Sequence, residues 1–161
     1  MSCDAGTLPA VDPLLELALM VKAGHRELER RMNDAMRPLG LTGAQADALA
    51  MIGKVGPLSL KDLGELLIAE AGHPSRLVDR LVEAGLVERR AAGEDRRRVE
   101  LSLTRRGRAL EKRMLAAREG VLQLGHQLIG DRDLTPAVEL FRDLLQYTPY
   151  AGLIERRRRM G

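Results

Sequence analysis

Apolar side chains recur every three or four positions along several long stretches of the chain. This period places them on one face of a helix. The pattern runs from residue 12 to residue 37, from Leu110 to Leu128, and again from Val138 to Leu145. It predicts long helices over residues 12–37 and, in two parts separated near Gly130, over 105–147.

Polar residues mark where further helices begin. Asp12 followed by Pro13 is typical of a first helical turn. Thr42 and Gln45 have the spacing of a capping box, in which each side chain satisfies a backbone amide at the helix start. Ser59 is expected to cap a short third helix, and Thr104 to cap the long helix from residue 105.

A fourth helix is predicted from His73 to Ala84, after the turn Glu70-Ala71-Gly72. Its apolar positions, Leu77, Val78 and Leu81, are expected to face inward. The side chains left on the solvent side are His73, Ser75, Arg76, Asp79, Arg80 and Glu83.

Two short strands follow this helix. Residues 86–90 mix apolar and charged side chains, and residues 99–103 alternate, with Val99, Leu101 and Leu103 expected inward. The loop predicted between them, residues 91–98, is polar and rich in arginine. Helix, turn, helix and hairpin in this order predict a mainly α winged helix-turn-helix fold with a two-stranded wing.

The whole chain, residues 1–161, suits a single domain. Residues 42–104 form the winged part, and segments 1–11 and 150–161 are expected to be mobile tails. Aromatic residues are only 2% of the chain, so an aliphatic core is predicted. The terminal arginines, Arg156–Arg159, are most simply a disordered tail, and a secondary phosphate-binding role is the less favoured alternative.

Positive charge gathers in one internal segment. Residues 71–108 contain ten arginines and six acidic residues, a net charge of +4, and residues 155–159 add +3. The formal net charge of the chain is +3, so the remainder sums to −4. Such a basic region is expected of a surface that binds phosphate.

Arg76 and Arg80 are four residues apart and share one helix face. Arginine can contact guanine through two hydrogen bonds or bind a phosphate. His73, Pro74 and Ser75 occupy the first turn, from which side chains reach base edges. The alternative is an ordinary solvated face on which Asp79 and Glu83 pair with these arginines. The neighbouring wing favours DNA contact.

The predicted hairpin tip contains Asp95, Arg96, Arg97 and Arg98. A narrow minor groove has an enhanced negative potential that attracts arginine, although a charged tip could also serve only solubility. Thr42 and Gln45 at the start of one helix, and Ser59 at the start of the next, are expected to contact phosphates, because free amides at a helix start favour an anion.

The ordered motifs resemble the MarR (multiple antibiotic resistance regulator) family. They lie within residues 42–108, and the flanking helices match the family layout in length and order. The residues that carry the resemblance are Gly72 to Leu81, Gly85-Leu86-Val87, Asp95-Arg96-Arg97, Leu103-Thr104 and Gly107. The resemblance implies a homodimer with the helix His73–Ala84 as recognition helix. It also implies that Asp95 holds a nearby arginine while Arg97 enters the minor groove. Such proteins usually repress genes and leave DNA when a small molecule or oxidant arrives.

The long helices extend beyond the compact winged part, so their apolar faces need a partner. A second copy of the chain is expected to cover Leu14, Leu15, Ala18, Val121, Leu124, Leu128, Phe141 and Leu144. An effector pocket, if present, would lie between these helices and the winged part, near His25 and Met32.

Other functions have less support. The chain has no Gly-rich phosphate loop, nucleophile elbow or His-Glu-x-x-His motif, so an enzyme is not expected. The three histidines are scattered, so neither a metal nor a cofactor is predicted. No apolar run is long enough for a membrane span, Cys3 is the single cysteine, and a cytoplasmic location is expected. A winged helix that binds protein instead of DNA is the remaining alternative.

Overall fold

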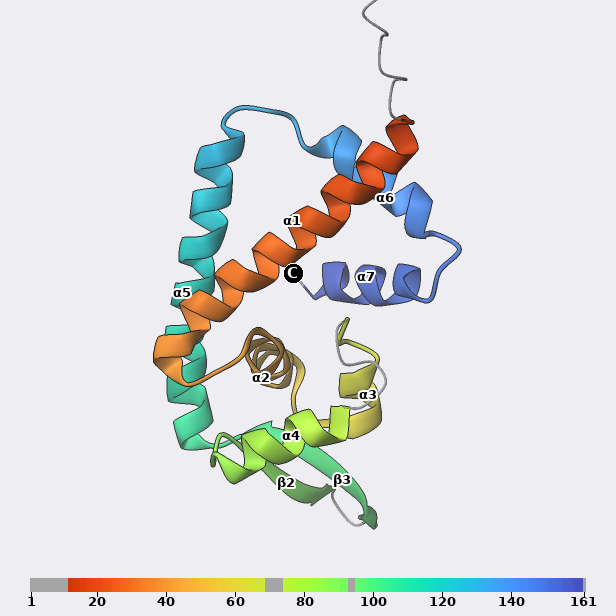
Figure 1. Cartoon of the computed structure of the whole chain (residues 1–161). Coiled ribbons are helices and arrows are strands. Elements are labelled where there is room, and N and C mark those ends of the chain that lie inside the picture. The colour runs from red at the N-terminus through yellow and green to blue at the C-terminus, as the bar shows by residue number, and fades with distance from the viewer. Residues whose placement is uncertain (1–11, 69–73, 93–94, 161) are drawn as a thin grey trace, which may run out of the picture.

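The computed structural model describes residues 12–68, 74–92 and 95–160, with the backbone alone for 92 and 95–98. Helices account for most of these residues (Figure 1). In chain order the elements are α1 (Pro13–Met36), the 3-10 turn η1 (Arg37–Leu39), α2 (Gly43–Val55), β1 (Leu58–Ser59), α3 (Leu60–Gly64), α4 (Pro74–Glu83), β2 (Val87–Ala92), β3 (Asp95–Leu103), α5 (Arg105–Ile129), α6 (Thr135–Leu145) and α7 (Tyr150–Arg159).

The predicted helix starts are confirmed. The Asp12 carboxylate accepts a hydrogen bond from the Leu14 amide (2.8 Å) at the start of α1. At α2, the Gln45 amide donates to the Thr42 hydroxyl (3.2 Å) and the Thr42 amide donates to the Gln45 side chain (2.9 Å). Ser59 caps α3, and Thr104 caps α5. These local contacts satisfy amides that have no partner inside their helix.

The sheet has three antiparallel strands in the order β1-β3-β2. Strand β1 was not predicted; it pairs Leu58 with Leu101 and Ser59 with Glu100. The prediction of a loop over residues 91–98 was also wrong, because β2 reaches Ala92 and β3 begins at Asp95. Hairpin strands satisfy each other's backbone groups, so the ladder continues past the apolar residues of the core.

Val99 shows where the wing leaves the core. It was expected to face inward with Leu101 and Leu103, but its side chain is 47% exposed, whereas theirs are 1% and 3% exposed. Val99 pairs with Ala91, next to a register shift between Ala91 and Ala92. The inward expectation for Val99 was therefore wrong, because the hairpin there has passed beyond the helices that cover the sheet.

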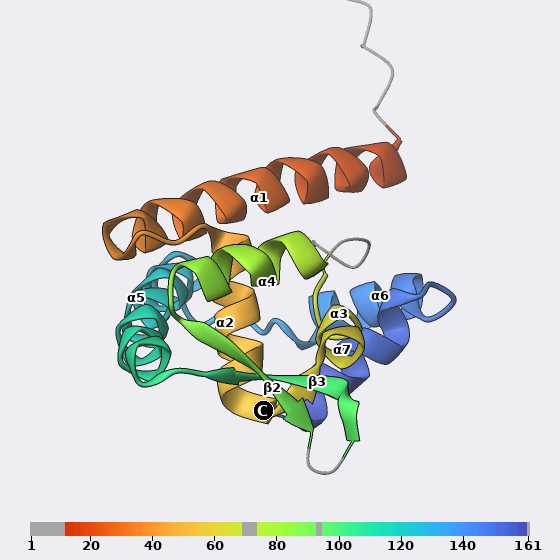
Figure 2. The ribbon, with the colours of Figure 1, turned by 90° about the horizontal axis from the view of Figure 1, so that it is seen from below.

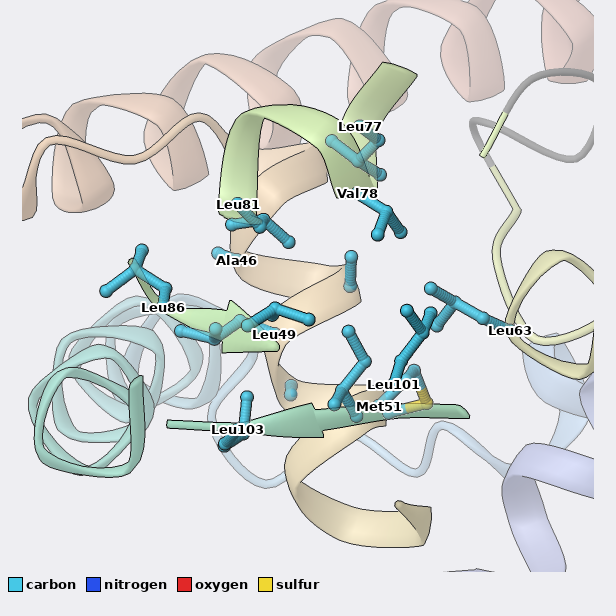
Figure 3. Packing of buried hydrophobic residues seen from close by; sticks show 14 of the residues in the cluster. Ala46, Leu49, Met51, Leu63, Leu77, Val78, Leu81, Leu86, Leu101 and Leu103 are labelled. Atoms are coloured by element: carbon cyan, nitrogen blue, oxygen red, sulfur yellow. The ribbon is translucent and has the colours of Figure 1, made fainter. Parts of the chain in front are cut away.

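An aliphatic core joins the sheet to the helices, as predicted. Its fully buried side chains come from α1, α2, α3, α4, β2, β3 and α5 and include Met36, Leu49, Leu63, Leu81, Val87, Leu101 and Met114. In the close-up, Leu77, Val78 and Leu81 of α4 lie over α2, near Ala46 and Leu49 (Figure 3). Burial of these side chains fixes which face of α4 remains in solvent.

The elements between residues 42 and 104 form one unit, here called the head. Helices α1 and α5 extend away from the head, and α6 and α7 return toward it (Figure 1). The mobile tail predicted for 150–161 was wrong for residues 150–159, which form α7 with Leu153 only 5% exposed. Burial of Leu153 holds this segment in place. The run of neighbouring arginines had favoured a disordered tail instead. The other predicted tail, residues 1–11, lies outside the described residues.

Candidate nucleic-acid interface

Helix α4 presents two arginines to solvent. Arg76 and Arg80 are exposed one turn apart, whereas Leu77, Val78 and Leu81 on the same helix are buried. Ser75 is exposed and Pro74 is half-buried at the start of the helix. His73, the other predicted recognition residue, lies outside the described residues. The helix thus has the amphipathic form that the sequence predicted.

The exposed arginines of α4 have no acidic partner among the described residues. Local pairing with Asp79 or Glu83 was the alternative to DNA contact. Instead, the Asp79 carboxylate accepts a hydrogen bond from Arg89 of β2 (2.6 Å). Arg76 and Arg80 therefore offer their guanidinium groups to a ligand without first breaking a described ion pair.

The contact between Asp79 and Arg89 joins α4 to the wing. The two side chains remain 48% and 41% exposed, so solvent reaches the pair. Arg89 was not among the residues predicted for the site. Asp79 and Arg89 are ten residues apart and lie on different elements, so neither the spacing of neighbours on a helix nor cross-strand pairing predicts their contact. Only the folded chain brings them together.

The wing carries further charge on strand β2. Arg90 is exposed and pairs with Glu88 two residues earlier (2.8 Å). On strand β3 the backbone places Asp95 opposite Ala92, at the hairpin end. Figure 2 shows this end of the hairpin extending past α3. The side chains of Asp95, Arg96, Arg97 and Arg98 lie outside the described part of the chain, so their predicted roles remain predictions.

The predicted phosphate contacts lie at the starts of α2 and α3. Their side chains already make capping bonds: Thr42 with Gln45, and Ser59 with Asp62, to which the Ser59 hydroxyl donates at 2.7 Å. Asn33 of α1, which the sequence did not predict for this site, accepts a hydrogen bond from the Gly43 amide (2.7 Å). Contact with phosphate at these helix starts stays a prediction.

The residues predicted for a dimer interface lie on α1, α5 and α6. Many have high exposed fractions, among them Leu14 (67%), Leu15 (56%), Leu128 (67%) and Leu144 (50%). Ala18 and Leu124 are also exposed, and Val121 and Phe141 are half-buried. Leu19 and Met20 of α1, which were not predicted, are 57% and 64% exposed. Large exposed apolar faces are typical of interaction surfaces, and the assignment of these residues to a dimer interface remains a prediction.

The two residues proposed for an effector pocket are far from equivalent. His25 is exposed on α1, with its Nε2 atom 3.5 Å from the Glu29 carboxylate. Met32 is half-buried and packs against the core. Their assignment to a pocket remains a prediction.

Membrane-spanning helices and metal-ligand clusters are absent from residues 12–68, 74–92 and 95–160. No helix in these ranges is both long and apolar enough to cross a membrane. Nor do these ranges contain a group of three or more histidine, cysteine or acidic side chains placed to hold a metal ion.

Comparison with known proteins gives one consistent result. The family model described as "MarR family" matches residues 39–98. The Bacillus subtilis protein YwoH, described as an uncharacterized HTH-type transcriptional regulator, is 31% identical, with 75% of this chain and 88% of YwoH covered. The B. subtilis HTH-type transcriptional repressor MdtR is 25% identical over 86% of this chain and 90% of MdtR.

The fold agrees with these sequence relationships. A crystal structure of a mutant MarR from Escherichia coli, complexed with operator DNA, superposes with a TM-score of 0.69. It is 24% identical and covers 83% of this chain and 99% of that one. The helix order, the wing and the sequence relatives agree, and this chain belongs to the MarR family of transcription regulators.

Proposed function

We propose that the protein binds double-stranded DNA as a homodimer at a pseudopalindromic operator and represses transcription until a small molecule releases it. Helix α4 enters the major groove and the wing lies along the adjacent minor groove. The observation that carries the proposal is the exposure of Arg76 and Arg80 on the free face of α4.

The electrostatics of α4 favour DNA over an uncharged partner. Two exposed guanidinium groups one turn apart can each bind a guanine edge or a phosphate oxygen. Desolvation of such groups is costly unless an anionic or strongly accepting partner replaces water. The phosphate backbone and the guanine edge both supply such acceptors.

The wing supports the same mode of binding. Arg89 and Arg90 are exposed on β2, and Arg96, Arg97 and Arg98 follow on β3. The contact between Arg89 and Asp79 couples the hairpin to α4. Two elements held together in this way can enter neighbouring grooves in a fixed relative position.

Exposed apolar faces on α1, α5 and α6 support the homodimer. A groove between α6 and α7 adds to them; its apolar lining includes Leu134, Val138, Phe141, Leu145 and Ile154. The first half of α1 carries the exposed leucines Leu14, Leu15 and Leu19, and it also carries the acidic residue Glu16. We assign the α6–α7 groove to the first half of α1 of a second copy, because its lining also holds two arginines, Arg142 and Arg158, against one acidic residue, Glu155.

Binding to the protein's own upstream DNA tests the proposal. Footprinting and mobility shifts should show a salt-sensitive complex on a site with two half-sites about 34 Å apart. Arg76→Ala and Arg80→Ala should each weaken it by about tenfold or more, as expected for loss of a base or phosphate contact.

Arg132→Ala is the matched control, because Arg132 is exposed beyond the far end of α5 and donates a hydrogen bond to the Ile129 carbonyl there. It should bind as tightly as the unaltered protein. Full affinity in both α4 variants at physiological salt would refute the assignment. Co-purification with a protein partner, without any salt-sensitive DNA complex, would favour the protein-binding alternative.

A further inference from the structure

Helix α7 connects the end of the chain to the head. It lies between α6 and the helices α2 and α3 (Figure 1), and it is seen behind α3 from below (Figure 2). Leu153 is 5% exposed, so the helix has an apolar anchor. Two arginines of α7 then make hydrogen bonds to residues 91 positions earlier.

Arg157 is the centre of this junction. Its Nε atom donates to the Leu66 carbonyl (2.7 Å), and its Nη2 atom donates to the Asp47 carboxylate of α2 (2.5 Å). The Arg157 side chain is 25% exposed and that of Asp47 is 32% exposed. A partly buried, charge-assisted pair of this kind holds its geometry more firmly than a solvated surface pair.

The carbonyls at this junction belong to the end of α3. Glu65 is the residue that follows α3, and its carbonyl accepts a hydrogen bond from Arg156 (3.1 Å). Carbonyls at a helix end have no partner within the helix, and the helix dipole favours a cation there. Because α3 is short, contacts from outside contribute strongly to its position.

The last two arginines of α7 have a different environment. Arg158 and Arg159 pair with Glu155 of the same helix, at 3.1 Å and 3.0 Å. Their hydrogen bonds lower the pKa of Glu155. Arg156 and Arg157 therefore differ from Arg158 and Arg159, because their partners lie in the head, and Arg157 alone of the two also pairs with a carboxylate there.

We infer that Arg157 is a positioning residue for DNA recognition: through Asp47 and the Leu66 carbonyl, it fixes the head relative to α6. The inference rests on the proposed function. The head contains α4, and α6 belongs to the proposed dimer surface, so the angle between them sets the distance between the two recognition helices of a dimer. Arg157 thereby restricts binding to operators of one half-site spacing.

The test compares operators in which the spacing between half-sites is shortened or lengthened by about one to three base pairs, each step changing the separation and rotation of the half-sites. The unaltered protein should bind one spacing at least about tenfold more tightly than the others. Arg157→Ala should lose most of that preference, binding the best site about tenfold more weakly. Its affinity for a single isolated half-site and its salt dependence should stay unchanged.

Four further variants separate positioning from other roles. Asp47→Ala should reproduce the effect of Arg157→Ala, and the double variant should be no worse than either single one. Arg159→Ala removes the same charge from an exposed neighbour and should behave as the unaltered protein. If Arg157→Ala folds poorly, Arg157→Lys retains the charge but loses the two-pronged contact, and the same loss of spacing preference is expected.

Two kinds of failure are distinguishable. A chain that binds no DNA would overturn the proposed function and this inference with it. Normal DNA binding with an unchanged spacing preference in Arg157→Ala would overturn this inference alone. A salt dependence weaker by about one phosphate contact would also overturn it, because Arg157 would then bind DNA directly. Amide exchange in α3 should accelerate in Arg157→Ala and not in Arg159→Ala; equal rates would contradict the junction.

Discussion

Asp79 of α4 accepts a hydrogen bond from Arg89 of β2 at 2.6 Å, and this contact ties the proposed recognition helix to the wing. Both side chains are exposed by more than two fifths, so the pair adds little to folding stability. Its effect is geometric: each element is held by the other in addition to its own packing against the core.

Replacement of Asp79 should change DNA affinity through two opposing effects, the loss of a negative charge and the release of the wing. Asp79→Ala removes a negative charge near DNA, which by electrostatics alone should strengthen binding. We expect weaker specific binding instead, by about three- to tenfold, because the wing is released from α4. Mobility shifts on the footprinted site measure the change, and a higher affinity for that site would contradict the geometric role.

Arg89→Ala completes a double-mutant cycle. If the contact acts as a unit, the double variant Asp79→Ala with Arg89→Ala should bind no more weakly than Arg89→Ala alone. Each single variant should change the free energy of unfolding by less than about 1 kcal/mol, as for other exposed ion pairs. A strictly additive loss would mean that the two side chains act separately.

Gly107 marks a close approach between α5 and the start of the wing. It is buried, and a Cβ atom there would lie 2.0 Å from the Leu86 carbonyl oxygen. We expect Gly107→Ala to lower the free energy of unfolding by about 2 kcal/mol, because backbone must move to admit it. Urea unfolding measures this loss.

Gly120 supplies the control for that substitution, since it lies on the same helix and a Cβ there would meet no atom within 4 Å beyond its chain neighbours and the backbone of its own helix. Gly120→Ala should stabilise α5 by up to about 1 kcal/mol through helix propensity. Equal changes in the free energy of unfolding for the two substitutions would show that the close approach to Leu86 does not affect stability.

Glu111 of α5 packs against Gly53 of α2, and burial raises the pKa of its carboxyl group, with Arg108 and Lys112 opposing the change. A raised pKa means that the folded chain holds this proton more tightly than the unfolded chain. The resulting stabilisation is complete below pH 4.5, the ordinary pKa, and is lost as pH rises through the folded value.

Glu111→Gln should therefore stabilise the protein at pH 7, by less than about 1 kcal/mol because the carboxylate is only partly buried. The gain should shrink as the pH falls and vanish below about pH 4.5. Urea unfolding at about pH 7 and about pH 4 measures both values. A variant less stable at the higher pH would mean that the carboxylate makes a favourable contact.

A charge on the apolar stripe of α1 should disrupt the proposed dimer. Leu14 is 67% exposed in the single chain, and Leu14→Glu would place a carboxylate in the covered face. We expect dimer dissociation to become at least about tenfold easier, measured by light scattering over a dilution series. Ala23→Glu is the control, because Ala23 is exposed halfway around the same helix. An unchanged mass in the Leu14 variant would place the interface elsewhere.

Local patterns predicted much of the helical framework. Asp12, Thr42 and Thr104 act on amides two or three residues away, so their helix starts follow from short-range chemistry. The inward face of α4 followed from the period of Leu77, Val78 and Leu81 for the same reason. The wing was predicted in outline, although its strands proved longer and Val99 proved exposed.

By itself, the sequence determined where helices start, which faces are apolar and where arginine gathers, because each depends on neighbours within about one helical turn. Only the tertiary structure decided that Arg89 meets Asp79, that Asn33 caps α2 and that Arg157 reaches Asp47 and Leu66. These partners are 10 to 110 residues apart. Hydrogen bonds of this range depend on how whole elements pack, and the packing depends on shape complementarity summed over the entire core.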